Sequence, residues 1–304
     1  MIRIIGTIFA GLLGLAFGSF LNVCLSRWPE GERIVQPRSH CRNCDHTLAW
    51  WENVPLVSWL LLRGRCRNCR AWIEWRYPVV ELGVGVLWAA TAWRFPTNFF
   101  IPNLPSVALY YALLTMLGSM VFYWLLVALA ILDAEHLWLP NWLTLPGTAA
   151  GFLVSTFGFV AAVELGSITH SPVHYNFQYL HGEQWQVAWS RLLAILAGAA
   201  LILFIRWVYW LVRHREGIGL GDAKLMAMLA AWLGLPGALL AFGIGVVLGA
   251  VVAVILLVMP GAQNRSEWWA ASKLPLGTFL CIGGVVSSLW GQSLIAAYLR
   301  WTGL

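Results

Sequence analysis

Long apolar runs recur along the whole chain and set its organisation. Eight of them are long enough to cross, or nearly cross, a lipid bilayer, and they lie at about 4–26, 78–95, 107–132, 140–162, 187–212, 222–235, 237–259 and 275–299. A membrane helix needs about 20 residues to span the hydrocarbon. The run at 222–235 is short, and Pro236-Gly237 separates it from the next, which predicts a tight helical hairpin. The pattern predicts an all-α polytopic membrane protein of about eight transmembrane helices.

Composition and charge narrow the class of protein further. Of the 304 residues, 60% are hydrophobic and only 11% are charged, and the mean hydropathy is +0.73. A soluble domain of this length carries far more charge on its surface, so we expect membrane lipid around the chain. The twenty tryptophans fit this class, because indole rings favour the headgroup region. The net charge of +6 arises mostly in loops between the runs, so we expect no nucleic-acid partner.

The basic residues also predict the orientation in the membrane. With the N-terminus outside, the inner segments hold fifteen of the 19 Lys and Arg residues and the outer segments hold four. Such a bias is typical of cytoplasmic loops. The first run follows Arg3 and looks like a signal peptide. Its end at Leu21–Cys24 lacks the small residues that cleavage needs, so we interpret it as an uncleaved span.

The longest polar segment between the runs contains the same tetrapeptide twice. Its cysteines are Cys41 and Cys44 in the first copy and Cys66 and Cys69 in the second, with about 21 residues between the copies. Two CxxC motifs at such a spacing are typical of a four-thiolate zinc site. A pair of disulfides is the alternative, but thiols stay reduced in the cytoplasm, where the arginines place this segment. We expect a structural zinc, because some fifty residues bury too little core to fold alone.

These features divide the chain into three parts. We predict a first transmembrane helix at 1–26, a cytoplasmic zinc-binding domain at 27–77, and a membrane domain of about seven helices at 78–304. An outer loop at about 163–186 carries three histidines, His170, His174 and His181. Their spacing fits no single helix face, so we favour a solvated loop over a metal site.

Two aspartates at the ends of apolar runs are the candidates for chemistry. The chain has only three aspartates, and Asp133 and Asp222 are the two beside the membrane. An aspartate inside a span costs about 2.5–3.5 kcal/mol near the centre, so both need a reason. Two carboxylates held close together share a proton: one activates water while the other donates a hydrogen bond to a carbonyl. Gly219 and Gly221 let the backbone turn sharply before Asp222.

The same residues also allow other interpretations. Asp222 can cap its helix, where the N-terminal dipole favours a negative charge. Asp133 can pair with Lys224, or both aspartates can serve a proton path. Cys24 and Cys281 lie in apolar runs and are expected to be core residues. From the residues alone, peptide hydrolysis and proton transport both stay open.

Several further motifs occur in order along the chain: GSFLNV at 18–23, RYPVVE at 76–81, LPN at 139–141 and GLGDAKL at 219–225. Together they resemble the motifs of the type IV prepilin peptidases, which are membrane aspartyl proteases of the GxGD kind. The resemblance covers nearly the full length. Three places depart from the family pattern: Asn141 stands where many bacterial members have aspartate, residues 273–279 replace a Pro-Phe-Gly-Pro-Phe run, and the outer loop at about 163–186 is longer than the family needs.

The resemblance implies a site, substrates and cofactors. It implies that Asp133 and Asp222 are the catalytic pair and that the cytoplasmic domain carries zinc. The implied substrates are prepilins or pseudopilins of type IV pili and type II secretion, cut after a glycine between a basic leader and an apolar helix. Many members also methylate the new N-terminus with S-adenosylmethionine. The implied location is the bacterial inner membrane, with the active site facing the cytoplasm.

Two other classes of function compete with this hypothesis. One is a proton-coupled transporter that uses Asp133 and Asp222, and the other is a non-catalytic zinc-bearing scaffold for pilus or secretion assembly. The sequence does not determine which pilin is cut, which aspartate is the base, or the oligomeric state.

Overall fold

The computed structural model describes residues 1–36, 38–94, 106–169, 184–215, 219–258 and 274–302. Within these ranges every regular element is a helix, and the only β-structure is two isolated bridges. It forms two compact units, one of Met1–Leu104 with Ser119–Ala128, and one of Pro105–Gly118 with Leu129–Leu304. The predicted all-α fold is confirmed for this part of the chain. The three histidines at 170, 174 and 181 lie outside the described residues.

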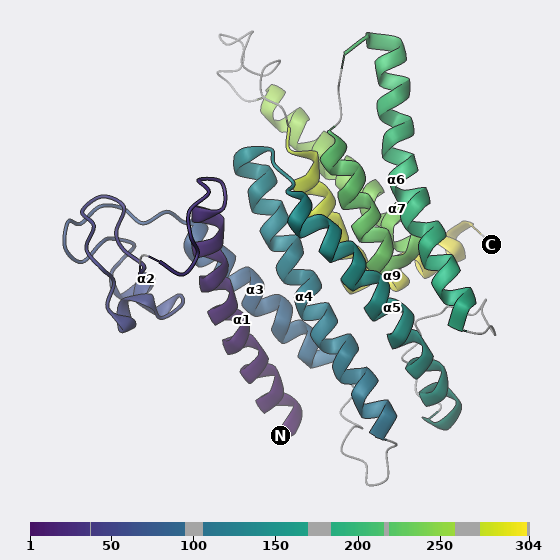
Figure 1. Ribbon diagram of the computed structural model, residues 1–304, viewed down its shortest axis with the longest axis horizontal. Helices are drawn as coiled ribbons and strands as arrows, with labels where there is room; N and C mark the ends of the chain where they lie inside the picture. Colours follow the sequence, from purple (N-terminus) through teal and green to yellow (C-terminus); the bar gives the residue numbers. More distant parts are fainter. Residues whose placement is uncertain (37, 95–105, 170–183, 216–218, 259–273, 303–304) are drawn as a thin grey trace. The chain divides into compact units, whose positions relative to one another are not determined.

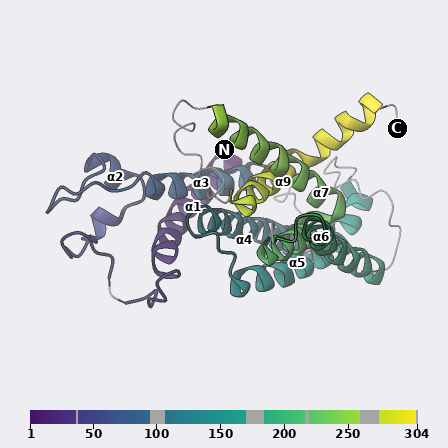
Figure 2. The same cartoon turned by 90° about the horizontal axis from the view of Figure 1, so that it is seen from above.

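In the first unit, α1 (Ile2–Arg27) and α3 (Arg76–Arg94) lie side by side (Figures 1 and 2). Small residues allow this approach. A Cβ on Gly18 would lie only 2.7 Å from the Glu81 Cα, a distance that no side chain tolerates. Glycine at this position therefore holds the two helices close together.

The segment between α1 and α3 is short of regular structure. It contains the 3₁₀ helix η1 (Trp50–Asn53) and the helix α2 (Val57–Leu61). The Leu56 N–H donates to the Glu81 carboxylate at 2.8 Å, and this bond fixes the segment to α3. Part of α4 (Ser106–His136) also belongs to this unit, where the carbonyl of its residue 120 accepts the Trp88 Nε1–H at 2.9 Å.

The second unit is organised around α7. Its helices are α5 (Asn141–Thr169), α6 (Gln184–Arg213), α7 (Leu220–Val258) and α9 (Leu276–Thr302), together with the end of α4. α7 packs against α5, α6 and α9. Met226 and Leu229 on α7 are fully buried, so this helix supplies much of the core.

The chain reverses direction within α7. Gly234 has φ 71° and ψ 175°, which is outside the helical region, and a proline follows two residues later. Both arms of α7 return to the beginning of α9. The first arm begins beside Leu139, which also adjoins Gly277, and in the second arm a Cβ on Gly249 would lie 3.3 Å from the Phe279 ring. The predicted helical hairpin is confirmed, with its turn at Gly234, two residues before the predicted position.

Five helices of the described chain are long and apolar enough to cross a membrane. They are α1, residues 113–136 of α4, residues 185–213 of α6, α7 and α9. All eight predicted runs lie in helices, but the number of spans by this measure is smaller. The two arms of α7 form one continuous element, and α3 and α5 are not among the five. α3 has only 19 residues and contains Glu81 between two terminal arginines.

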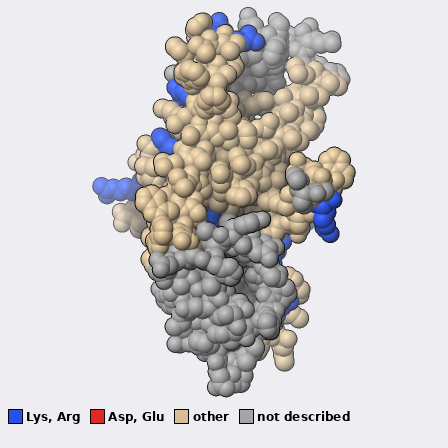
Figure 3. Space-filling model, turned by 90° about the vertical axis from the view of Figure 1, so that its right-hand side faces the viewer, with Lys and Arg blue, Asp and Glu red and all other residues tan. Residues whose placement is uncertain are grey.

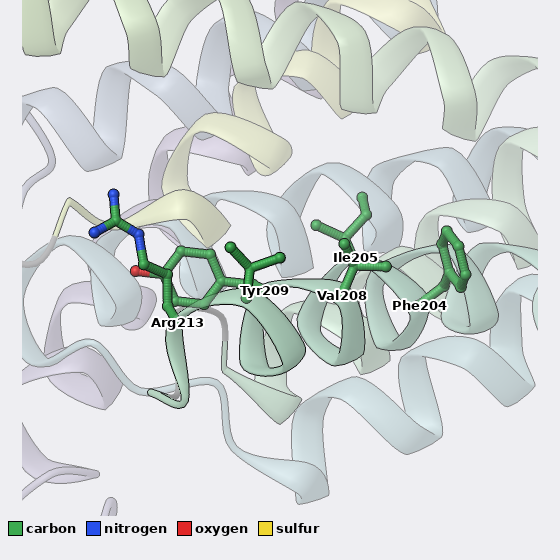
Figure 4. Close-up of a pocket in the computed structure, with 6 residues that line it drawn as sticks. Phe204, Ile205, Val208, Tyr209 and Arg213 are labelled. Carbon is green, nitrogen blue, oxygen red and sulfur yellow. The ribbon is translucent and has the colours of Figure 1, made fainter.

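The surface of the membrane helices is apolar. On the face shown in Figure 3, uncharged residues cover most of the described surface and Lys and Arg are scattered. Figure 4 shows an open pocket of about 370 Å³ on α6, where Phe204, Ile205, Val208 and Tyr209 precede Arg213. These lining residues all belong to one helix and are mostly apolar. We therefore assign the pocket to the lipid-facing surface.

Candidate active site and metal centre

Asp133 is a buried carboxylate at the start of another helix. Asp133 is only 5% exposed. Its Oδ2 accepts the Thr278 N–H at 2.7 Å. Thr278 is the third residue of α9, so Asp133 occupies the positive end of that helix, where a negative charge is favoured. Gly277 makes this approach possible, because a Cβ there would lie 2.8 Å from the Asp133 Oδ2.

The end of α4 differs from the prediction. The predicted run stops at residue 132, whereas α4 continues to His136. Asp133 therefore lies within the last turn of its helix, which ends where Leu137 takes a left-handed φ of 50°. The polar residues Glu135 and His136 extend the helix beyond its apolar part and pair with each other at 3.8 Å.

Asp222 begins the helix on the other side of the site. It is the third residue of α7 and is 8% exposed. Its Oδ2 accepts the N–H of Gly219 at 3.2 Å, the residue just before the helix. A side chain at this position that binds the N-cap N–H forms half of a capping box. The capping interpretation is therefore geometrically correct, and it uses one of the two carboxylate oxygens.

The two aspartates converge although they are far apart in the chain. Their charges are close enough to interact, and Cys281 on α9 lies within electrostatic range of both. Leu139 joins the same region. A Cβ on Gly221 would lie 3.0 Å from the Leu139 Cβ, and one on Gly277 would lie 3.0 Å from the Leu139 Cδ1. The ends of α4, α7 and α9 therefore meet at one place.

Lys224 binds Asn141 and not Asp133. Its Nζ donates to the Asn141 Oδ1 at 2.6 Å. Within the described ranges, no ion pair joins Lys224 to Asp133. Each carboxylate instead accepts a backbone N–H at the start of a helix, and the charge of Asp133 acts on Asp222.

The four predicted zinc ligands lie together in the first unit. The Sγ atoms of Cys41, Cys44, Cys66 and Cys69 all lie within 4.8 Å of one another. The Cys41–Cys69 and Cys44–Cys66 sulfur distances are 3.8 and 3.9 Å. Disulfide sulfurs lie about 2.05 Å apart, and the four cysteines are free thiols. A zinc–sulfur bond of about 2.3 Å places tetrahedral sulfurs about 3.8 Å apart, so the cluster can hold a metal ion of this kind.

The two cysteine motifs repeat the same backbone structure 25 residues apart. In the first, the Cys41 N–H donates to the His46 carbonyl at 2.9 Å; in the second, the Cys66 N–H donates to the Ala71 carbonyl at 2.8 Å. An isolated β-bridge flanks each motif at equivalent positions. Asp45 and Arg70 both take a left-handed φ, of 53° and 60°. We call these two structures the first and second knuckle.

Each knuckle donates a hydrogen bond to a cysteine of the other. The Asn43 amide lies 3.5 Å from the Cys69 Sγ, and the Asn68 amide lies 3.6 Å from the Cys44 Sγ. The Asn43 amide lowers the pKa of the Cys69 thiol to about 6, whereas burial raises the pKa of the Cys41 thiol to about 11. Four neighbouring thiolates repel one another, and a bound dication compensates their negative charges.

Some residues of both sites were not predicted as functional. Thr278 contacts Asp133, and Leu139 lies beside Gly221 and Gly277 at two helix starts, yet the sequence alone predicts no role for either. Thr278 could have been found from its place in the sequence, because it is a polar residue that follows a glycine at the start of an apolar run. The asparagines of the knuckles were visible as the repeated third residue of the tetrapeptide.

The comparisons with known proteins cover both units. A family model described as "Bacterial Peptidase A24 N-terminal domain" matches residues 12–95, and one described as "Type IV leader peptidase family" matches residues 120–254. The first contains all four clustered cysteines, and the second contains both converging aspartates. No solved structure matches the chain.

Relatives of the chain carry the name "Prepilin leader peptidase/N-methyltransferase", and three of them show the extent of the match. Those of Stutzerimonas stutzeri and Pseudomonas aeruginosa are each 32% identical, over 96% of this chain and 93% of the relative. That of Myxococcus xanthus is 37% identical over 86% of this chain and 66% of the relative. At this identity over nearly the full length, and with both family models matched in order, the chain belongs to the type IV leader peptidase family of bacterial membrane proteins.

Proposed function

We propose that this chain is a membrane aspartyl endopeptidase that removes the basic leader of prepilins or pseudopilins, with Asp133 and Asp222 as its catalytic pair. The convergence of these two buried carboxylates carries the proposal. They come from separate helices and their charges interact. Both belong to the part of the chain that the type IV leader peptidase model matches. The names of the relatives add the substrate class.

The proposed reaction needs one ionised and one protonated carboxyl group. The ionised group takes a proton from water as the water oxygen attacks the scissile carbonyl. The protonated group donates a hydrogen bond to the carbonyl oxygen as it gains charge. The tetrahedral intermediate collapses when its C–N bond breaks and the leaving amine takes a proton from the pair. Interaction between the two charges favours this singly protonated state.

The proposed substrate matches the location of the pair. A basic leader stays in the cytoplasm and the apolar helix behind it lies in the bilayer, so the cut falls at the membrane surface. Asp133 and Asp222 lie at the ends of membrane helices, on the side where fifteen of the 19 basic residues fall in the proposed topology. We propose that this side is the cytoplasm.

We propose that residues 27–77 form a zinc domain, with Cys41, Cys44, Cys66 and Cys69 as ligands. The sulfur spacing supports a tetrahedral site, and the amides of Asn43 and Asn68 support the thiolates. The metal would have a structural role, because four protein ligands leave no open position for a substrate. The division into residues 1–26, 27–77 and 78–304 follows from this assignment.

The second activity in the relatives' names is N-methylation, and we propose that this chain uses S-adenosylmethionine for it. An open pocket of about 460 Å³ between α1 and the zinc domain supports this, since it is of the size that small ligands occupy. Its polar and aromatic lining includes Ser19, Arg27, Arg38, Ser39, Trp50 and Asn53. A guanidinium can bind the carboxylate of the methyl donor, and an exposed indole can stack on its adenine.

Binding of S-adenosylmethionine to the purified protein tests this pocket. We expect Arg38→Ala and Trp50→Ala each to weaken binding about ten-fold in calorimetry, because each removes a direct contact. Leader cleavage should stay unchanged in both. Arg65→Ala is the matched control, because it removes another exposed arginine of the same domain that does not line the pocket. Equal binding by all variants would place the methyl donor elsewhere, and absence of binding by the unaltered protein would remove the methyltransferase assignment.

Co-expression with a prepilin tests the peptidase itself. We expect the prepilin to lose its leader and shift to a smaller size only when this protein is present. The cut should fall after the glycine at the junction. A proton-driven flux without any cleavage would favour the transporter, and pilus assembly that needs the cysteines but no cleavage would favour the scaffold.

A further inference from the structure

Thr278 brings three polar contacts to the end of α4. Its N–H donates to the Asp133 Oδ2 at 2.7 Å, and its Oγ1 lies 3.3 Å from the same oxygen. The Oγ1 also lies 2.8 Å from the Ala130 carbonyl oxygen, one turn earlier in α4. A hydroxyl has one proton to donate and two lone pairs to accept with. The Thr278 hydroxyl therefore has two acceptors in reach and can donate to only one at a time.

We propose that Thr278 is a positioning residue for Asp133, whose hydroxyl changes its partner as the carboxyl group gains and loses its proton. The inference rests on the proposed peptidase function. When Asp133 is ionised, the hydroxyl donates to the carboxylate. When Asp133 is protonated, the hydroxyl donates a hydrogen bond to the Ala130 carbonyl and accepts one from the O–H of the carboxylic acid. No buried polar group loses its partner in either state.

The contrast with Asp222 shows why the hydroxyl matters. The hydrogen bond of Asp222 comes from the Gly219 N–H, which can only donate. A backbone N–H favours the ionised form of a carboxyl group and cannot accept a hydrogen bond from the O–H of the neutral form. Thr278 offers Asp133 a backbone N–H, which only donates, and a hydroxyl, which can either donate or accept a hydrogen bond. Asp133 can therefore change its protonation state within the reaction without a movement of the backbone.

The geometry also fixes the position of the carboxylate. Gly277 leaves no space between α9 and Asp133 for another side chain, since a Cβ there would lie 2.8 Å from the Oδ2 and 2.9 Å from the Cγ. The N–H and the hydroxyl of Thr278 both bind the Asp133 Oδ2, so this oxygen is fixed against the start of α9. A carboxylate fixed at one oxygen keeps a defined orientation, which is what general acid–base chemistry needs.

The test compares Thr278→Val, which keeps the shape and the N–H but removes the hydroxyl, with Thr278→Ser, which keeps both donors. Leader cleavage by the full-length purified protein is measured across pH. For Thr278→Val we expect kcat to fall about ten-fold with KM within about two-fold, because the residue acts on Asp133 and not on the substrate. The acidic limb of the pH profile should move up by about one unit, because the charge-assisted hydrogen bond to the ionised carboxylate is stronger than the bond that the hydroxyl accepts from the neutral acid, and its loss therefore costs the ionised form more. Thr278→Ser should restore both.

A matched control separates positioning from packing. Thr148→Val removes a hydroxyl that donates to a carbonyl of its own helix, the Thr144 oxygen at 2.8 Å, and should change neither kcat nor the pH profile. A lower kcat in Thr278→Val with an unmoved pH profile would reduce Thr278 to a packing role and overturn the inference. The same holds if Thr278→Ser behaves like Thr278→Val. If the unaltered protein cleaves no prepilin, the proposed function fails instead, so the two failures are distinguishable.

Discussion

Asp133→Asn and Asp222→Asn should each abolish leader cleavage while the protein still accumulates in the membrane. An amide cannot take a proton from water and cannot share one with a carboxylate, so either change removes the acid–base chemistry, which contributes about 10²–10⁴ in rate. Each amide has nearly the size of the carboxylate it replaces, and it can still accept the N–H of Thr278 or Gly219 through its oxygen. We expect no processed prepilin in the co-expression assay with either variant.

The third aspartate provides the control. Asp45→Asn makes the same chemical change at an exposed position with a φ of 53°, which asparagine adopts readily. It should cleave as well as the unaltered protein. Full cleavage by Asp133→Asn or Asp222→Asn would remove that residue from the mechanism, and loss of cleavage in all three would mean that the effect is not specific to the pair.

Loss of one zinc ligand should unfold the small domain of the first unit. Cys66→Ser removes a buried thiolate from the cluster. Structural zinc contributes roughly 10–16 kcal/mol of apparent binding free energy in small zinc domains, so the loss exceeds what a domain of this size gains from its core. Metal analysis should show about one zinc per chain before the change and almost none after it. Thermal unfolding and proteolysis of residues 27–77 should both occur under milder conditions.

A cysteine outside the cluster separates metal loss from a general effect of the substitution. Cys24 is buried in α1 and does not belong to the four clustered thiols. Cys24→Ser should retain its zinc. A Cys66→Ser protein with full zinc content and unchanged unfolding would contradict the structural role of the metal.

The helices of this chain follow from the hydrophobic pattern, because each apolar run must satisfy its backbone within one segment in the bilayer. The reversal in α7 also follows from local sequence, since a glycine and a proline lie between two apolar runs. The end of α4 lies beyond its apolar run, because Glu135 and His136 are polar and still continue the helix. Hydropathy predicts the apolar segment of a helix but not a polar turn that continues it.

Chemistry-bearing residues were easier to predict than their partners. Asp133 and Asp222 stand out because acidic residues are rare in this chain, and the cysteines stand out through their repeat. Thr278 lies 145 residues from Asp133, and only the packing of α9 against the end of α4 brings its donors to the carboxylate. The role of Leu139 likewise depends on three helix ends that meet. Such contacts carry no local signal.

The reciprocal hydrogen bonds from the Asn43 and Asn68 amides have a consequence for how this domain folds and unfolds. Each half supplies two sulfurs and a donor for a sulfur of the other half, so neither half is a finished structure when it leaves the ribosome. The loop between them can vary in length, provided that the two halves still meet. A change that unfolds one knuckle also removes ligands and a hydrogen bond from the other, so we expect the two knuckles to unfold together.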